Sequence, residues 1–329
     1  HTQNWLGSLK LRASYGMIGN QNVPAYSFIP TMTVNNKYNG WLSGGNYVTA
    51  ITSLPSLVSS NFTWEKVGTI DIGLDFSMFS NRFTGTFDWY QRNTNGMLAP
   101  GMQLPAVVGA SAPYQNTADM RTRGWELSVN WRDQIGKVGY RVGFNLSDSQ
   151  SKIVKYNSNE SGILTSALSN GSTFWNYYEG KDLGEIWGYE TIGIAKSQAE
   201  MDAHLASLPN GGQRTLAAEW KAGDIMYKDL NGDGKISSGA GTLEDHGDLK
   251  YLGDNQSHYL FGIDINADWK GFDFRCFFQG VLKHNVWQSD GYFWGAYNNV
   301  WKSYGMKEHA DYFRDAPVGL PGQELPANL

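Results

Sequence analysis

The sequence predicts an all-β protein, an antiparallel transmembrane β-barrel with long extracellular loops. Three observations support this fold class: strands that alternate apolar and polar residues, very short turns that join the strands in pairs, and long segments between the pairs. A tilted strand needs about 9–11 residues to cross a bilayer, which matches the length of the alternating segments. We therefore expect one face of each strand to contact lipid and the other face to line a lumen.

The first pair of strands shows this alternation most clearly. One face of its first strand carries Ile70, Ile72, Leu74, Phe76 and Met78, and the other carries Thr69, Asp71, Gly73, Asp75 and Ser77. After a turn at Ser80-Asn81, Phe83, Gly85, Phe87 and Trp89 alternate with Thr84, Thr86, Asp88 and Tyr90. A period of two indicates a strand, because successive side chains point to opposite faces.

Two further pairs and one single strand follow the same pattern. The predicted strands span about 8–16, 67–79, 82–92, 122–132, 138–148, 257–269 and 272–280. Short turns at Gln134-Ile135-Gly136-Lys137 and at Lys270-Gly271 join the second and third pairs. The long loops at about 17–66, 93–121, 149–256 and 281–329 then all fall on one side of the membrane, as an outer-membrane barrel requires.

A soluble β-sandwich also alternates, but two features favour the membrane. Aromatic residues gather at the strand ends beside the turns, where interfacial girdles lie: Phe79, Phe83, Trp131, Trp269 and Phe272. The polar faces carry charges that a dry sandwich core would not accept: Glu126, Arg132, Asp264, Asp268 and Arg275. We expect these charges to shape the wall of a polar lumen.

Composition excludes several other classes of protein. The 329 residues carry a formal net charge of −5 and show no basic stripe, so no nucleic-acid partner is expected. The single cysteine, Cys276, allows neither a disulfide framework nor a thiolate zinc site. The sequence contains no run of about 18 apolar residues, so no transmembrane helix is predicted. The chain has no recognisable signal peptide or closing strand, so we expect it to be part of a longer polypeptide.

The loop at 149–256 is too long to lack structure of its own. Ser197 and Glu200 form a capping-box pattern that predicts a short helix through Met201, His204 and Leu205. Residues 186–189 form an extended patch that favours a strand.

The same loop contains a pattern typical of calcium binding. Residues 229–236 match the first eight positions of an EF-hand-type loop, with oxygen ligands at Asp229, Asn231 and Asp233 and a backbone carbonyl at Lys235. A hard cation prefers such oxygen ligands, and the alternate spacing aims them at one point. The expected cofactor is a structural calcium ion that stiffens the loop.

Position 12 of this loop is Ala240 instead of glutamate, so another carboxylate must complete the site. Glu244, Asp245 and Asp248 are the candidates, and we favour Asp248. The competing interpretation is a solvated Asn-Gly and Asp-Gly turn that holds no ion.

No catalytic motif was found, so the chain is not expected to be an enzyme. The histidines are scattered, and no nucleophile elbow, P-loop or dinucleotide-binding glycine pattern is present. Aromatic residues cluster in two loops, at Trp175, Tyr177 and Tyr178 and around Trp287, Tyr292 and Trp294. Such rings can stack on sugars, and Trp287, Tyr292 and Trp294 are the candidate substrate contacts, although packing within the loop also explains aromatic clusters.

Specific strings add a resemblance to a known family. In chain order they are Asn61-Phe62-Thr63-Trp64-Glu65-Lys66, Ile72-Gly73-Leu74-Asp75-Phe76, Asp88-Trp89-Tyr90, Thr94-Asn95-Gly96-Met97-Leu98, Asn116, Gly124-Trp125-Glu126-Leu127, Glu179-Gly180, Trp187-Gly188-Tyr189, Gly223-Asp224-Ile225, the 229–236 loop, Gly247-Asp248-Leu249 and Tyr259-Leu260-Phe261-Gly262. In this order and spacing the chain resembles the C-terminal barrel region of SusC/RagA-type TonB-dependent transporters. An inserted segment, Ser237–Glu244, departs from the pattern.

The resemblance implies a portion of a 22-stranded plugged barrel in the outer membrane of a Gram-negative bacterium. It implies active import of oligosaccharides or peptides, a SusD-like surface lipoprotein partner and energy from the TonB complex. The plug domain would precede this chain and the final strands would follow it. Two other functions stay open at this point: a passive porin, and a secreted β-rich carbohydrate-binding protein or hydrolase.

Overall fold

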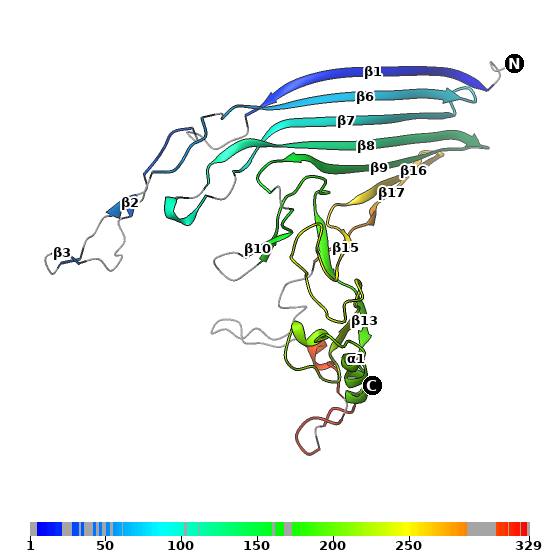
Figure 1. Cartoon of the computed structure of the whole chain (residues 1–329). Helices are drawn as coiled ribbons and strands as arrows, with labels where there is room; N and C mark the ends of the chain where they lie inside the picture. Colours follow the sequence, from blue (N-terminus) through cyan, green and yellow to red (C-terminus); the bar gives the residue numbers. More distant parts are fainter. Residues whose placement is uncertain are drawn as a thin grey trace. The chain divides into compact units, whose positions relative to one another are not determined.

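A computed structural model of the whole chain shows one large sheet and a second compact unit (Figure 1). The structure describes residues 5–21, 28–32, 34–35, 42–43, 46–47, 51–52, 55–60, 62–101, 104–110, 112–159, 162–167, 173–287, 307–314, 316–322 and 324–327. Unit 1 comprises residues 1–162, 175–183 and 256–284, and unit 2 comprises the rest.

Unit 1 contains an antiparallel sheet of seven strands in the order β1-β6-β7-β8-β9-β16-β17, which lie side by side in Figure 1. The strands are β1 (Leu6–Asn20), β6 (Glu65–Met78), β7 (Phe83–Pro100), β8 (Tyr114–Ile135), β9 (Val138–Tyr156), β16 (His258–Trp269) and β17 (Phe272–Lys283). The seven strands lie in the sheet in the order in which they occur in the chain, as in a meander, although shorter elements intervene between β1 and β6 and between β9 and β16. The prediction of an all-β antiparallel fold is confirmed.

The remaining elements are short. They are β2 (Val34–Asn35), β3 (Leu42–Ser43), β4 (Asn46–Tyr47), β5 (Ile51–Thr52), η1 (Ala106–Val108), β10 (Thr165–Ala167), β11 (Thr173–Trp175), β12 (Glu185–Tyr189), β13 (Thr191–Ile194), α1 (Gln198–Ala206), η2 (Gln213–Thr215), β14 (Ile225–Tyr227), β15 (Leu249–Asp254) and η3 (Lys307–Ala310). The short strands pair as β2-β5, β3-β4, β10-β11, β12-β15 and β13-β14.

Several strands run further toward the long loops than their alternation predicts. The ladder between β7 and β8 continues to Pro100 and Tyr114, past a bulge between Thr94 and Met97. Backbone hydrogen bonds define these extensions, and they do not require one apolar face. Sequence alternation therefore marks only the part of each strand whose two faces meet different surroundings.

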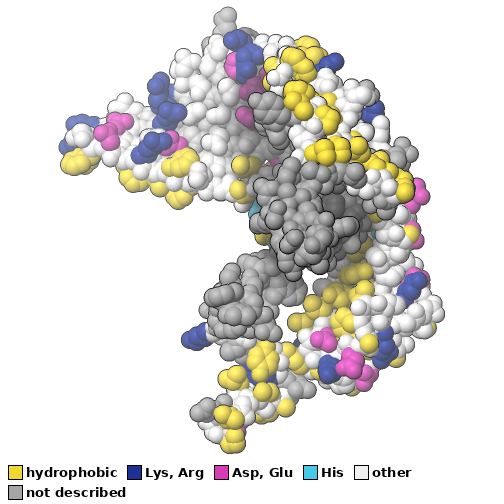
Figure 2. All heavy atoms as spheres, turned by 90° about the vertical axis from the view of Figure 1, so that its left-hand side faces the viewer, with side chains coloured by type: hydrophobic (Ala, Val, Ile, Leu, Met, Phe, Trp, Pro, Cys, Tyr) yellow, Lys and Arg dark blue, Asp and Glu magenta, His cyan; other side chains and the backbone are white. Residues whose placement is uncertain are grey.

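The apolar face of the sheet is uncovered. Its exposed side chains include Leu9, Leu11, Tyr15, Ile70, Ile72, Phe87, Val142, Phe272, Phe274 and Phe278. Leu11, on edge strand β1, is 73% exposed and Phe272, on edge strand β17, is 75% exposed. A large exposed apolar patch marks a surface that contacts lipid or a partner. Figure 2 shows hydrophobic side chains gathered in contiguous bands on the surface. This exposure supports a lipid-facing surface, not one half of a sandwich core.

The polar face is held together by charges from adjacent strands. The Arg12 side chain on β1 donates to both Asp75 oxygens on β6, at 3.0 and 2.9 Å, and to Asp88 Oδ1 on β7 at 2.7 Å. Gly73 lies between them, where an added Cβ would come within 2.6 Å of Arg12 Nη2 and even closer to Asp88 Oδ1. Gly73 therefore leaves the space that this three-strand bridge occupies.

Replacing Gly73 with alanine is expected to displace the Arg12 bridge and to lower the urea concentration at the midpoint of unfolding, because charge-assisted hydrogen bonds are lost. Urea unfolding of the full-length protein in lipid measures this change. Gly16→Ala on β1 is the matched control, since nothing lies within 4 Å of a Cβ added there. Equal losses from the two substitutions would contradict the role given to Gly73.

Aromatic rings lie at the end of the sheet that carries the short turns. The Trp131 ring lies 6.2 Å from both Phe79 and Phe83, and Trp269 stacks on Phe272 at 6.5 Å. Lys270 and Gly271 both have positive φ, the geometry of a two-residue hairpin turn. The rings that the sequence places at the strand ends thus form contacting pairs.

Unit 2 contains its own small core, formed by Ala195, Met201, Leu205 and Met226, with Trp220 packed against them. Helix α1 begins as predicted: the Ser197 side chain accepts from the Glu200 N–H at 3.2 Å. The Glu200 carboxylate accepts from the Lys196 N–H at 2.7 Å, one residue earlier than a capping box places it. No helix among the described residues is long and apolar enough to cross a membrane.

Candidate functional site

Three carboxylates of unit 2 converge at the predicted calcium loop. Oxygens of Asp229, Asp233 and Asp248 all lie within 4.8 Å of one another. Asp229 and Asp233 follow strand β14, and Asp248 directly precedes β15. The fold therefore brings together residues from two separate segments of the loop.

The chain wraps around Asp229. Its Oδ1 accepts from the Gly232 N–H at 2.6 Å, and its Oδ2 accepts from the Gly234 N–H at 2.8 Å. Gly232 and Gly234 have φ values of 75° and 81°, a region that side chains disfavour. The two glycines thus provide the sharp turns that an EF-hand-type loop needs.

Asp248 is fully buried and organises the rest of the loop. Its Oδ1 accepts from the Leu230 N–H at 2.7 Å, and its Oδ2 accepts from the Ser237 N–H at 2.8 Å. Of the three carboxylates left open by the sequence, Asp248 is the one that lies with Asp229 and Asp233. Asp245 is exposed and accepts from the Ala240 N–H instead, at 3.0 Å, and Glu244 is exposed as well.

The other two predicted ligands lie beside Asp233. The Asn231 Oδ1 accepts from the Asp233 N–H at 3.0 Å, and its Nδ2 donates to Asp233 Oδ2 at 3.3 Å. The Lys235 N–H donates to Asp233 Oδ1 at 3.0 Å, and its Nζ lies 3.8 Å from Asp233 Oδ2. The three carboxylates form a compact set of oxygens suited to a hard cation, with the Asn231 amide hydrogen-bonded to Asp233 and one ammonium group at the edge.

Glu190 joins the strands that flank this loop. It lies between β12 and β13, and its two oxygens contact Lys228 Nζ at 3.3 Å and Lys250 Nζ at 2.8 Å. Hydrogen bonds from Lys250 and Lys228 lower the pKa of Glu190 below its usual value. Burial raises the pKa of nearby Tyr189, with the charge of Asp248 adding to the effect.

This lowered pKa predicts a pH dependence. The stabilisation by Glu190 is present above the usual glutamate pKa and is lost as the pH falls through the lowered folded-state value. The amide protection factors of Lys228 and Lys250, which correct for the intrinsic slowing of exchange in acid, are therefore expected to fall on acidification, and Glu190→Gln should abolish most of that fall. Hydrogen exchange between neutral and acidic pH measures these factors. Glu219→Gln, an exposed control whose ammonium partner is 3.8 Å away, should retain the full fall.

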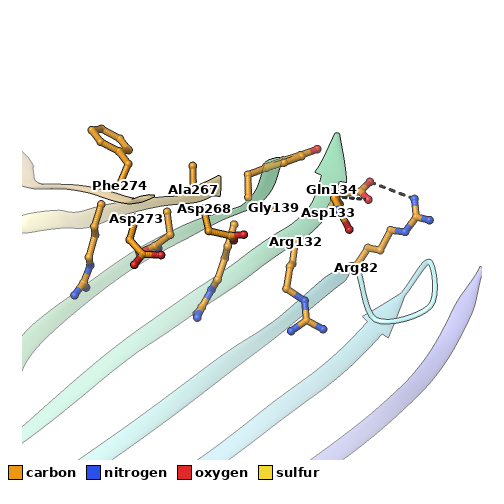
Figure 3. Close-up of a pocket in the computed structure, with 13 residues that line it drawn as sticks. Arg82, Arg132, Asp133, Gln134, Gly139, Ala267, Asp268, Asp273 and Phe274 are labelled. Atoms are coloured by element: carbon orange, nitrogen blue, oxygen red, sulfur yellow. Dashed lines mark hydrogen bonds and ion pairs between the residues drawn. The ribbon is translucent and has the colours of Figure 1, made fainter. Parts of the chain in front are cut away.

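Near the turns of unit 1, charged side chains of the polar face, together with Tyr140, Ala267 and Phe274 of the other face, line an open cavity of about 790 Å³. Its charged lining residues are Arg82, Arg132, Asp133, Arg141, Asp268, Asp273 and Arg275. Figure 3 shows Arg132, Asp268 and Asp273 on one side of the sheet and Phe274 and Ala267 on the other. Of the five charges that the sequence predicts for the lumen wall, Arg132, Asp268 and Arg275 line this cavity, and Glu126 and Asp264 do not.

Comparison with known proteins decides the family. Residues 2–193 match the family model described as "TonB dependent receptor-like, beta-barrel". This chain belongs to that family. Members of this TonB-dependent receptor family lie in the outer membrane of Gram-negative bacteria, and the exposed apolar face of the sheet fits that location.

Individual TonB-dependent receptors are similar over most of the chain. TonB-dependent receptor P3 of Formosa agariphila is 28% identical over 284 residues, which cover 85% of this chain and 26% of the relative. TonB-dependent receptor SusC of Bacteroides thetaiotaomicron is 28% identical over 287 residues, covering 86% and 26%. The chain thus spans about a quarter of the length of these relatives.

A solved structure shows the same fold. The structure of the RagAB peptide transporter aligns with a TM-score of 0.56 and 22% identity, covering 84% of this chain and 27% of that one. The resemblance to the SusC/RagA-type barrel is confirmed.

The predicted substrate contacts of this TonB-dependent barrel chain are only partly described. Trp287 is 59% exposed, whereas Tyr292 and Trp294 lie outside the described residues. In the other aromatic cluster, Lys181 is buried and places its Nζ 5.7 and 5.5 Å from the ring centroids of Tyr177 and Tyr178. These two rings are therefore engaged in packing within the loop.

Proposed function

We propose that the polypeptide carrying this chain imports nutrients actively across the outer membrane, driven by TonB. The observation that carries this proposal is the family match, which spans 58% of the chain, 192 of its 329 residues. The structure adds physical support, because an uncovered apolar face and a charged opposite face are what the wall of a polar passage through lipid needs.

The proposed cargo is an oligosaccharide or a peptide, taken up together with a SusD-like surface lipoprotein. Similarity to SusC and to the RagAB peptide transporter supports a partnered importer of this kind. The chain itself would not catalyse a reaction. Its long loops would contact the lipoprotein or the cargo, and its polar face would line the route inward.

Uptake by intact cells tests this proposal. A strain lacking the full-length gene is expected to lose growth on one oligosaccharide or peptide mixture and to regain it with the gene only when TonB is present. Uptake that continues without TonB would instead support a passive porin. Release of the full-length protein from membranes without detergent would support a secreted carbohydrate-binding protein.

We further propose that the loop binds a structural calcium ion through Asp229, Asn231, Asp233, the Lys235 carbonyl and Asp248. The convergence of three carboxylates around a glycine-rich turn supports this proposal. A site of this kind with a dissociation constant of about 10⁻⁴–10⁻³ M would still be filled outside the cell.

Calcium at millimolar concentration is therefore expected to slow amide exchange across residues 229–237 of the full-length protein, and Asp233→Asn should remove most of that protection. Lys235→Ala is the matched control. It keeps the backbone carbonyl and removes an ammonium 3.8 Å from Asp233 Oδ2, so calcium should bind at least as tightly. Protection that is the same with and without calcium would favour the ion-free turn.

A further inference from the structure

Three arginines occupy one row across the polar face of the sheet. Arg132 on β8 is directly opposite Arg141 on β9. Arg141 is opposite Asn266 on β16, and Asn266 is opposite Arg275 on β17. Like charges placed directly opposite each other on one face destabilise a sheet, so this row requires compensation.

The positive charge of Arg275 is compensated by a carboxylate within the sheet. Its Nε and Nη2 donate to the two oxygens of Asp264, at 3.2 and 3.1 Å. Asn266 Nδ2 also donates to Asp264 Oδ1, at 3.1 Å, which leaves this carboxylate fully engaged. Asp264 therefore pairs directly with Arg275, and its charge also acts on Arg141 without forming an ion pair with it.

Arg132 and Arg141 lack such a carboxylate partner. Arg141 donates from Nε and Nη2 to the amide oxygen of Asn130, at 3.2 and 2.9 Å, a neutral acceptor. Arg132 forms no ion pair with any residue that the structure describes. Asp133, its neighbour in sequence, pairs with Arg82 at 3.2 Å. Two guanidinium groups thus face the cavity without a counter-charge in contact.

The other acidic residues of the cavity lie one row nearer the turns. Asp268 and Asp273 are directly opposite each other, and neither lies within 4 Å of Arg132 or Arg141 as an ion pair among the described residues. Asp268 instead lies over Gly139, where an added Cβ would be 2.5 Å from its Oδ1. The cavity is therefore divided into a basic pair and an acidic pair.

We propose that Arg132 and Arg141 form a binding site for a carboxylate group. Guanidinium groups recognise carboxylates through paired, charge-assisted hydrogen bonds, and a cavity of about 790 Å³ leaves ample room for one. A singly charged carboxylate fits better than a phosphate dianion, because Asp268 and Asp273 share the cavity and repel added negative charge.

The carboxylate has two possible sources with the same chemistry. It belongs either to a solute that enters the lumen or to an acidic side chain elsewhere in the same polypeptide. The solute source rests on the import proposed above. The experiment below measures binding without measuring uptake, so the two proposals fail separately.

Arginine modification by phenylglyoxal in the full-length protein in detergent tests this site, with mass spectrometry reporting each arginine. Arg214, which is exposed in unit 2, provides the reference rate. Arg275 should react slowly under all conditions, since Asp264 already holds it. Propionate, which carries a single carboxylate, is the added probe. If the site takes solutes, propionate slows modification of Arg132 and Arg141 about tenfold relative to Arg214.

If the carboxylate is internal, Arg132 and Arg141 are unreactive even without propionate. Carbodiimide treatment of an Arg132→Lys variant then joins residue 132 to an acidic residue outside the seven-stranded sheet, and peptide mapping names it. Two results would overturn the proposal. One is modification of both arginines at the Arg214 rate with and without propionate. The other is a cross-link from residue 132 to Asp268 or Asp273, which would show that the sheet neutralises itself.

Discussion

Replacing Leu127 with arginine is expected to lower the unfolding free energy of the full-length protein in lipid vesicles by about 2–4 kcal/mol. Leu127 lies in the middle of β8 on the apolar face, directly between Phe87 and Leu146. A charge there must enter the hydrocarbon layer, where neither water nor a counter-charge stabilises it. Urea unfolding from phospholipid vesicles, followed by tryptophan fluorescence, measures the loss.

Ser128→Arg is the matched control for this prediction. Ser128 is the next residue along β8 and points to the polar face, between Thr86 and Asn145. Its substitution is expected to cost much less, because the side chain enters a polar lumen. A larger loss from Ser128→Arg than from Leu127→Arg would mean that the faces of the sheet are assigned the wrong way round.

Replacing Asp248 with asparagine is expected to destabilise the calcium-type loop by about 1–3 kcal/mol, the cost of one buried polar group left unpaired. The buried carboxylate accepts from the Leu230 and Ser237 N–H groups on separate oxygens. An amide has only one acceptor oxygen, so one buried N–H would face an NH₂ group and lose its partner. Hydrogen exchange should accelerate at residues 229–237 and remain unchanged in the central part of β8.

Asp245→Asn separates this effect from a simple loss of negative charge. Asp245 lies in the same turn region, is exposed, and accepts from the Ala240 N–H at 3.0 Å. Its substitution is expected to change exchange only locally, near Ala240. Equal acceleration across residues 229–237 in both variants would show that the burial of Asp248 has no special role.

The strands and their two faces were predictable from the sequence, whereas the pairing of individual residues was not. Alternation over about ten residues reports which side of a strand each residue occupies. It does not report register, which depends on the length of the connecting turn. The turn expected over residues 134–137 is in fact tighter, since Ile135 pairs with Val138. That register places Arg132 opposite Arg141, a juxtaposition that spacing alone does not reveal.

In the calcium-type loop, too, the residues that are close in sequence were predictable and the distant residue was not. The spacing of Asp229, Asn231 and Asp233 is local, and the glycines beside them make the turn recognisable. Asp248 remained one of three alternatives because its position depends on how the inserted segment folds back. Gly239 and Gly247, both with positive φ, turn that segment. No periodic pattern in the sequence encodes such a path. The sequence could therefore only favour Asp248 among three candidates for the last carboxylate ligand.

The pairing of β12 with β15 has a consequence for how the sheet assembles. Strands β9 and β16 are neighbours in the sheet but are separated in the chain by the whole segment from Tyr156 to His258. The β12·β15 ladder joins Glu185 to Asp254, so it brings the two distant parts of that segment together. If this small sheet forms first, a shorter effective length of free chain remains to be ordered when β9 and β16 meet. The entropic saving is on the order of 1 kcal/mol, since closure cost grows only with the logarithm of length. The paired strands β12 and β15 would then favour assembly of the seven-stranded sheet one hairpin at a time.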